Sequence, residues 1–112
     1  MVWKVARNQK SIFANDAPNH TAYSDYYDKR FSFKTYNELC VPIKATGSAS
    51  SQIVGVVEFL NKRSAPSDCV RAAGMELTEV PWTELDQQLA EQLMNHVARC
   101  MVRALSAYDM HN

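Results

Sequence analysis

The chain has 112 residues, which is enough for one domain built around a single hydrophobic core. Its 12 Lys and Arg residues balance its 12 Asp and Glu residues. Because no net positive charge attracts phosphate backbones or anionic lipid, neither nucleic acid nor a membrane is an expected partner. No segment approaches the ~18 consecutive apolar residues of a membrane span, and no apolar run follows the first basic residues, which predicts a cytoplasmic protein.

The three cysteines, Cys40, Cys69 and Cys100, are widely spaced, which favours reduced thiols over a disulfide framework. Cys40 lies within an apolar run and Cys100 within a helical stripe. In such places a free cysteine usually packs as a small hydrophobic residue. The chain has no CxxC pair, and no cysteine is expected to have a histidine partner at ligand spacing, so neither a metal site nor a cofactor is expected.

The first third of the chain predicts a short helix, a brief strand and a loop. Residues 2–6 have a helical pattern, residues 11–14 are typical of a strand, and turn-forming residues gather at 15–20. Residues 23–34 are aromatic but follow the period of neither a helix nor a strand. Their rings are expected to anchor a loop or lid over the core: Tyr23, Tyr26, Tyr27, Phe31 and Phe33.

Two apolar strands joined by a loop of small residues are predicted in the middle of the chain. Residues 39–44 alternate apolar with other side chains, and Pro42 among them indicates an edge, a bulge or a strand end. Residues 52–62 predict a second, buried strand, and both strands are expected to be central in the sheet. Glu58 shares one face of this strand with apolar side chains, where a carboxylate is costly unless it has a partner.

The last third predicts a surface insertion at residues 64–80, followed by a long amphipathic helix at residues 83–107. Thr83 is a good N-cap, and Glu84 and Asp86 place negative charge in the first turn. At 1.5 Å per residue this helix would be about 37 Å long, so its end is expected to project and to seek a partner helix. Its apolar stripe steps by four residues: Leu85, Leu89, Leu93, Val97, Met101 and Leu105.

Three blocks of the chain resemble the GAF domains that sense small molecules in cyclic-nucleotide phosphodiesterases, adenylyl cyclases and other signalling proteins. The blocks are residues 5–6 with 16–17, residues 33–35 leading into 39–43, and residues 55–62 continuing to 82–87. The resemblance implies an α+β fold related to PAS domains, with an antiparallel sheet and flanking helices.

The third block is similar to a signature of the phosphodiesterase subgroup, in which an Asn-Lys pair, a Phe and an Asp-Glu pair follow one another. Lys62 and Asp86 match the positions that form a structural salt bridge in that subgroup. Trp82 stands in place of the Phe, and Gln87 in place of the Glu. The resemblance therefore implies that the Lys62–Asp86 pair joins the strand to the C-terminal helix.

The resemblance also implies three ligand contacts. Asp28, Thr35 and Glu58 match positions that contact the ligand in cyclic-nucleotide-binding members, whereas Phe31 stands where such members have a Thr. A cyclic nucleotide or another purine is therefore the implied ligand. Residues 1–112 would form one GAF-like domain that lacks the first helix and the first two strands of the family. An incomplete sheet edge of this kind implies either a partner chain or a fragment of a longer protein, and a homodimer is expected.

Three functions follow from these observations. The first is a non-catalytic regulatory domain that senses a small polar molecule, with Glu58 accepting a hydrogen bond from it. The alternative pairing of Glu58 with a Lys or Arg of this chain stays open. The second is a dimerisation or interaction module without a ligand. The third, reduction of methionine sulfoxide by Cys40 and Cys69, is not expected because neither thiol has a visible activating neighbour, so the chain is not expected to be an enzyme.

Overall fold

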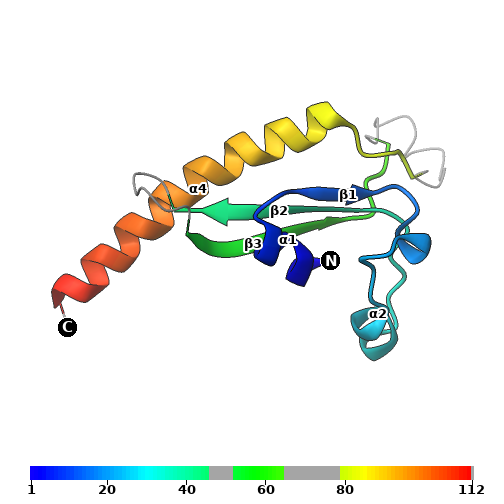
Figure 1. The fold of residues 1–112 in the computed structure, drawn as a ribbon, viewed down its shortest axis with the longest axis horizontal. Coiled ribbons are helices and arrows are strands. Elements are labelled where there is room, and N and C mark those ends of the chain that lie inside the picture. The colour runs from blue at the N-terminus through cyan, green and yellow to red at the C-terminus, as the bar shows by residue number, and fades with distance from the viewer. Residues whose placement is uncertain (46–51, 65–78, 112) are drawn as a thin grey trace, which may run out of the picture.

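The computed structural model describes residues 1–45, 52–64 and 79–111 (Figure 1). Apart from two short helices within residues 17–31, where loops are predicted, the helices and strands occur in the predicted order. The predicted class, the antiparallel sheet and the long C-terminal helix are confirmed. The elements are α1 (Val2–Asn8), β1 (Ile12–Ala14), the 3-10 helix η1 (Ala17–Asn19), α2 (Tyr26–Phe31), β2 (Glu38–Lys44), β3 (Ile53–Leu60) and α4 (Glu84–His111).

Strand β2 is the centre of a three-stranded antiparallel sheet with the order β1-β2-β3. Cys40 of β2 pairs with Ile12 of β1 on one side and with Glu58 of β3 on the other. Pro42 lies beyond the β2 residues that pair with β1, so at this position β2 has one described neighbour, β3. A proline is tolerated at such a place because no second ladder requires its missing N–H.

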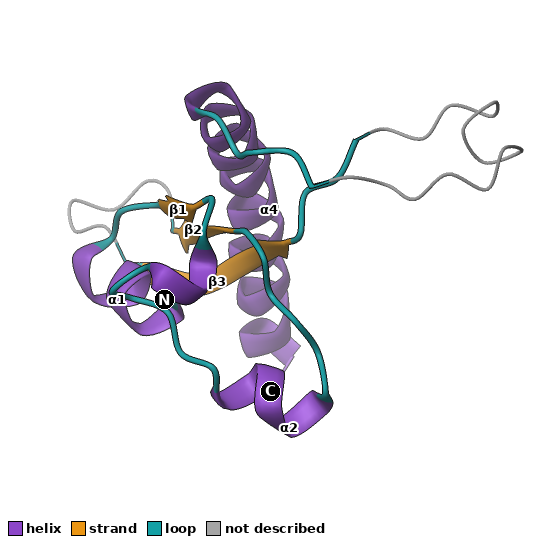
Figure 2. Ribbon diagram, turned by 90° about the vertical axis from the view of Figure 1, so that its right-hand side faces the viewer, coloured by secondary structure: helices purple, strands orange, loops and turns teal. Residues whose placement is uncertain are grey.

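The sheet lies between α4 on one face and α1 on the other (Figures 1 and 2). Strand alternation directs Leu39, Val41 and Ile43 toward α4. There they form the buried core with Met94 and Ala98 of the helix. The main core of the domain is therefore the layer between the sheet and α4, and the alternate side chains of β2 face α1.

Helix α4 begins with the cap that the sequence predicts at Thr83. The backbone N–H of Asp86 donates a hydrogen bond of 3.2 Å to Thr83 Oγ1, and the backbone N–H of Thr83 donates one of 2.9 Å to Asp86 Oδ2. This reciprocal pair satisfies a backbone donor of the first turn and fixes the start of the helix.

Helix α4 is 28 residues long and so spans about 42 Å, somewhat more than the sequence predicts. Its C-terminal turns run past the end of the sheet in Figure 1, as expected. Three leucines near its start, Leu85, Leu89 and Leu93, expose 63%, 57% and 54% of their surface. The predicted apolar stripe is therefore only partly covered by the sheet, because Met94 and Ala98 define the side that packs on β2.

The prediction that β3 is a buried, central strand is wrong for the described sheet. Only β2 is central, and β3 is half-buried, with Glu58 and Leu60 exposed. The reason is that β3 lies at the edge of the described strands while α4 packs chiefly over β2. A run of β-branched residues indicates a strand but does not fix its place in the sheet.

The prediction of aromatic rings anchored on the core at residues 23–34 is also wrong. Residues 26–31 form helix α2, which stands away from the sheet in Figure 2. Tyr26, Tyr27 and Phe31 expose 58%, 67% and 66% of their surface. Tyr27 and Phe31 stack on each other with ring centroids 6.3 Å apart, because a spacing of four residues brings them to one face of the helix.

The predicted surface insertion at residues 64–80, with Cys69, falls almost entirely outside the described residues. Cys40 is buried, as predicted, but Cys100 is exposed on α4. It lies about 200° around the helix from the buried Ala98, which places it on the solvent side. None of the described helices combines the length and the apolar character needed to cross a membrane.

Candidate ligand site

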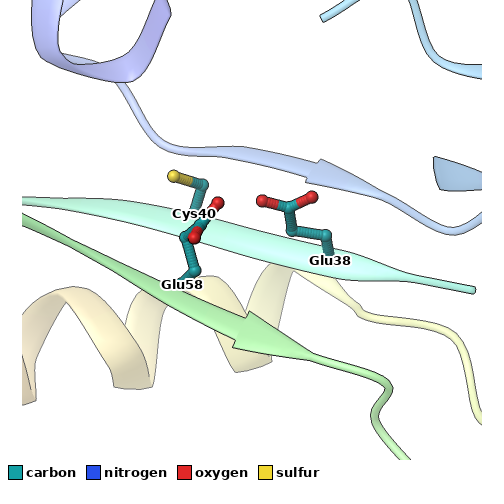
Figure 3. A group of neighbouring side chains, drawn as sticks. All are labelled: Glu38, Cys40 and Glu58. Atoms are coloured by element: carbon teal, nitrogen blue, oxygen red, sulfur yellow. The ribbon is translucent and has the colours of Figure 1, made fainter. Parts of the chain in front are cut away.

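Three reactive side chains meet on the face of the sheet opposite α4. Glu38 and Cys40 of β2 and Glu58 of β3 point to this face, toward α1 (Figure 3). Cys40 and Glu58 are direct cross-strand partners, and Glu38 is two residues from Cys40 on the same face. The two carboxylates and the thiol each offer an atom within 4.8 Å of the others.

Within this cluster, the carboxyl group of Glu38 has the environment that most disfavours a negative charge. Its side chain is buried, the residue being 4% exposed, and its Oε1 has no hydrogen-bond partner among the residues that the structure describes. Burial raises the pKa of Glu38 to about 8, and the hydrogen bond to Glu58 and the negative charge of Glu58 act in the same direction. Glu38 therefore favours its protonated form at neutral pH, whereas Glu58 is exposed.

The thiol of Cys40 shares this environment. Burial raises its pKa to about 12, with smaller contributions from the negative charges of Glu58 and Glu38. A protonated, buried thiol is a poor nucleophile. Cys40 therefore lacks the lowered pKa that activates a nucleophilic cysteine.

A cavity of about 480 Å³ opens beside the two carboxylates. Its walls combine acceptor groups with aromatic rings from α1 and α2, and the residues that line it are Met1, Val2, Trp3, Ser24, Tyr26, Tyr27, Glu38 and Glu58. Its size lies within the range of pockets for small molecules. Such walls suit a flat ligand that donates hydrogen bonds, since the carboxylates accept them and the rings can stack on it.

Asp28 and Thr35 lie together but apart from Glu58. Asp28 Oδ2 accepts hydrogen bonds from the Tyr23 hydroxyl at 2.7 Å and from the Thr35 N–H at 2.8 Å, and Oδ1 accepts one from Thr35 Oγ1 at 2.8 Å. Burial opposes ionisation of Asp28, but these hydrogen bonds together lower its pKa. The hydrogen bond between Tyr23 and Asp28 is the largest of the influences that raise the pKa of Tyr23 to about 12. The group fastens both ends of the segment that carries α2.

A second, smaller cavity of about 290 Å³ lies on the Asp28 side of α2. Its lining includes Phe31, the residue that stands where cyclic-nucleotide-binding members have a Thr. The structure thus brings Asp28 and Thr35 to one place and Glu58 to another. Glu58 is the only one of the three that lines the larger cavity.

Lys62 and Asp86 form an ion pair between the exit of β3 and the first turn of α4. Their Nζ and Oδ2 atoms are 2.5 Å apart, and Lys62 Nζ also donates a hydrogen bond of 3.2 Å to the Pro81 carbonyl. Trp82 lies beside the pair, with Lys62 Nζ 5.7 Å from its ring centroid, and packs near Phe59. Hydrogen bonding from Lys62 is the largest influence on the Asp86 carboxylate and lowers its pKa.

Two asparagines fix the chain after β3: Asn61 of the Asn-Lys pair, and Asn37, which the sequence reasoning overlooked. Asn61 has a left-handed backbone with φ 58°, and its side chain accepts a hydrogen bond of 2.7 Å from the Tyr36 N–H. The buried Asn37 accepts one of 2.7 Å from the Lys62 N–H. These bonds clamp the Asn-Lys exit onto the residues that precede β2.

Glu38 is a functional candidate that the sequence reasoning overlooked, and Cys40 was considered there only for redox chemistry. A signal was available, because the alternation that places Glu58 on one face of its strand places Glu38 and Cys40 opposite Leu39 on theirs. What the sequence could not supply is the register, which sets Cys40 directly across from Glu58.

Comparison with known proteins agrees with this architecture. A family model described as GAF domain matches residues 1–101, a range that includes α1, the whole described sheet and most of α4. No curated protein matches the chain. Because the family match covers all but the last turns of the C-terminal helix, the chain belongs to the GAF domain family.

Proposed function

We propose that this domain is a non-catalytic regulatory module that binds a small polar molecule in the cavity beside Glu38 and Glu58. GAF domains are typically regulatory modules for small ligands. The observation that carries the proposal is the exposed Glu58 carboxylate on the wall of a cavity of about 480 Å³. Its position on a paired strand provides a rigid base for recognition.

The chemistry of the cavity supports a ligand rich in hydrogen-bond donors. Glu58 offers acceptor oxygens, and Trp3, Tyr26 and Tyr27 offer ring faces. A purine with amino and ring N–H groups fits this description, and a cyclic nucleotide fits it if the phosphate lies away from the carboxylates. The match of Lys62 and Asp86 to the phosphodiesterase-type signature supports the same ligand class.

Asp28 and Thr35 enter the proposal in an indirect role. The oxygen atoms of Asp28 already accept three hydrogen bonds, so a direct ligand contact would have to replace one of them. These bonds hold the segment that carries Tyr26 and Tyr27, two residues of the cavity wall. Asp28 and Thr35 therefore act on the ligand by positioning α2.

A thermal-shift screen with cyclic nucleotides, purines and amino acids tests the proposal. A chelator is included throughout, so that metal ions play no part in the result. A ligand of the cavity raises the unfolding temperature of the wild type and loses this effect in Glu58→Gln. Glu79→Gln is the matched control, because Glu79 is exposed and lies outside the lining of the cavity. If no compound stabilises the wild type, the proposal fails.

A second candidate function is a dimerisation module, and the exposed leucines of α4 favour it. Leu85, Leu89 and Leu93 form a stripe at four-residue intervals beside a groove of about 230 Å³ between α4 and the sheet. Strand β3 also has only one partner, β2, among the described strands. Sedimentation equilibrium of the wild type and Leu89→Glu tests this function. A homodimer that Leu89→Glu dissociates supports it, and a monodisperse wild-type monomer excludes it.

A further inference from the structure

The cluster of Glu38, Cys40 and Glu58 has the composition of a metal site as well as of a ligand wall. We propose that these three side chains bind a divalent metal ion of the zinc type, with one coordination position open to the cavity. The atoms that would bind the ion already lie within 4.8 Å of one another. They project from two hydrogen-bonded strands to the same face of the sheet (Figure 3).

The buried carboxyl of Glu38 is an independent reason to place a cation here. Glu38 is 4% exposed, its side chain points into the cluster, and its Oε1 lacks any hydrogen-bond partner within the described part of the protein. A buried polar atom without a partner costs free energy, and native structures rarely leave one. A cation between Glu38 and Glu58 satisfies this oxygen and, once it displaces the Glu38 proton, offsets the repulsion between the two ionised carboxylates.

The donor set indicates zinc rather than calcium or magnesium. Calcium and magnesium prefer oxygen ligands alone, whereas a thiolate beside carboxylates suits zinc. In a tetrahedral site with bonds of about 2.0 to 2.3 Å, the donor atoms lie roughly 3.4 to 3.6 Å apart. The three ligand atoms, now within 4.8 Å of one another, can reach this spacing by side-chain rotation, because Glu58 is exposed and free to rotate. On binding, the Cys40 thiol and the Glu38 carboxyl group each release a proton to solvent, and they coordinate as the thiolate and the carboxylate.

The site has three protein ligands rather than four. Three ligands leave a fourth position for water or for an exogenous group, as in zinc sites that interact with small molecules. Glu38 and Glu58 line the cavity, so the open position lies on its side of the cluster. The inference does not depend on the proposed small-molecule ligand, since the ion can bind without it.

A rival pair of ligands on α4 has to be separated from this site. Cys100 Sγ lies 3.9 Å from His96 Nε2, and both residues are exposed. This proximity corrects the expectation that no thiol has a histidine partner. Two ligands on a solvent-exposed helix lack the enclosing shell of the cluster at Cys40. Variants that keep Cys40 as the only cysteine therefore isolate the proposed site.

The test is equilibrium dialysis of the full chain against Zn²⁺, combined with Co²⁺ absorption spectra that report thiolate coordination. Cys69→Ser/Cys100→Ser should bind one ion and show the thiolate-to-cobalt charge-transfer band. Cys40→Ser in this background should lose the band, and Glu58→Gln should weaken affinity at least about tenfold. Circular dichroism establishes that each variant is folded. Because Glu58 is exposed, Glu58→Gln is expected to fold even if Cys40→Ser does not.

Either of two results would overturn the inference. One is that Cys69→Ser/Cys100→Ser does not bind Zn²⁺, and the other is that Glu58→Gln leaves the affinity for Zn²⁺ unchanged. Failure here leaves the proposed function intact, since the small-molecule screen is performed with a chelator. Conversely, Cys40 is not among the residues that line the cavity, so ligand binding should survive Cys40→Ser in the presence of the chelator.

Discussion

The ammonium group of Lys62, just after β3, is 2.5 Å from the carboxylate of Asp86 in the first turn of α4. The same carboxylate accepts a hydrogen bond from the backbone N–H of Thr83. One side chain thus both caps the helix and joins it to the sheet. The docking of α4 on β2, which builds the main core, begins at this contact.

Asp86→Ala should destabilise the domain by about 1 to 2 kcal/mol, because it removes the ion pair and half of the reciprocal cap. Urea denaturation of the wild type, Asp86→Ala, Lys62→Ala and the double variant measures the effect and the coupling. The double variant should be more stable than the sum of the two single changes predicts. Additive losses would show that the two side chains act separately.

The stabilising effect of Asp86 should depend on pH in the acid range. Its pKa in the folded protein is lowered from the ordinary value of 3.8, so the ionised form is favoured by folding. The contribution is complete above pH 3.8 and is lost as the pH falls through the lowered pKa. The difference in unfolding temperature between the wild type and Asp86→Asn should be constant from pH 7 to pH 5 and shrink below pH 4. A difference that persists unchanged at low pH contradicts this origin.

Glu38→Gln should make the metal-free protein more stable at alkaline pH. The pKa of Glu38 is about 8 in the folded protein and 4.5 as its ordinary value, so the wild type loses stability as the pH rises from 4.5 to 8. A glutamine does not ionise and escapes this loss. With chelator present, the gain should reach a few kcal/mol near pH 8 and vanish near pH 4.5. Equal stability of the two proteins at both pH values would refute the buried, protonated state of Glu38.

Asp28→Asn should loosen the segment that carries α2 and destabilise the domain by about 1 to 3 kcal/mol. Tyr23→Phe removes one of the three hydrogen bonds to Asp28 and should cost about 1 kcal/mol. Asp25→Asn is the matched control, since Asp25 makes an exposed ion pair with Lys29 and should change stability by less than about 0.5 kcal/mol. Urea denaturation ranks the three variants, and a control as damaging as Asp28→Asn would contradict the special place of Asp28.

The sequence predicted elements that depend on local patterns. The alternation of residues 39–44 and the cap at Thr83 each have a physical cause within a few residues, and both appear in the structure. The aromatic segment was misjudged because its rings stack on one another along α2 instead of on the core. A helix of six residues, whose rings contact one another and not the core, is too short to show a helical period of apolar residues.

The candidate site was predicted less completely because it depends on register and on which face each helix covers. Glu58 was identified as an unusual carboxylate, but its neighbours Glu38 and Cys40 come from a strand about twenty residues earlier. Only the pairing of Cys40 with Glu58 joins them. Likewise, Asp28 and Thr35 resemble ligand residues in sequence, yet their hydrogen bonds to each other are visible only in the folded chain.

The central claim is that Glu58 helps to bind a small polar molecule in the cavity on the α1 face. Calorimetric titration with a cyclic nucleotide or purine identified by thermal shift tests it most directly, in the presence of chelator. The wild type and Glu79→Gln should bind equally, and Glu58→Gln should bind roughly 10 to 100 times more weakly, as expected for loss of a charged hydrogen bond. Equal affinity in Glu58→Gln, or heat changes that show no binding to the wild type, would contradict the claim.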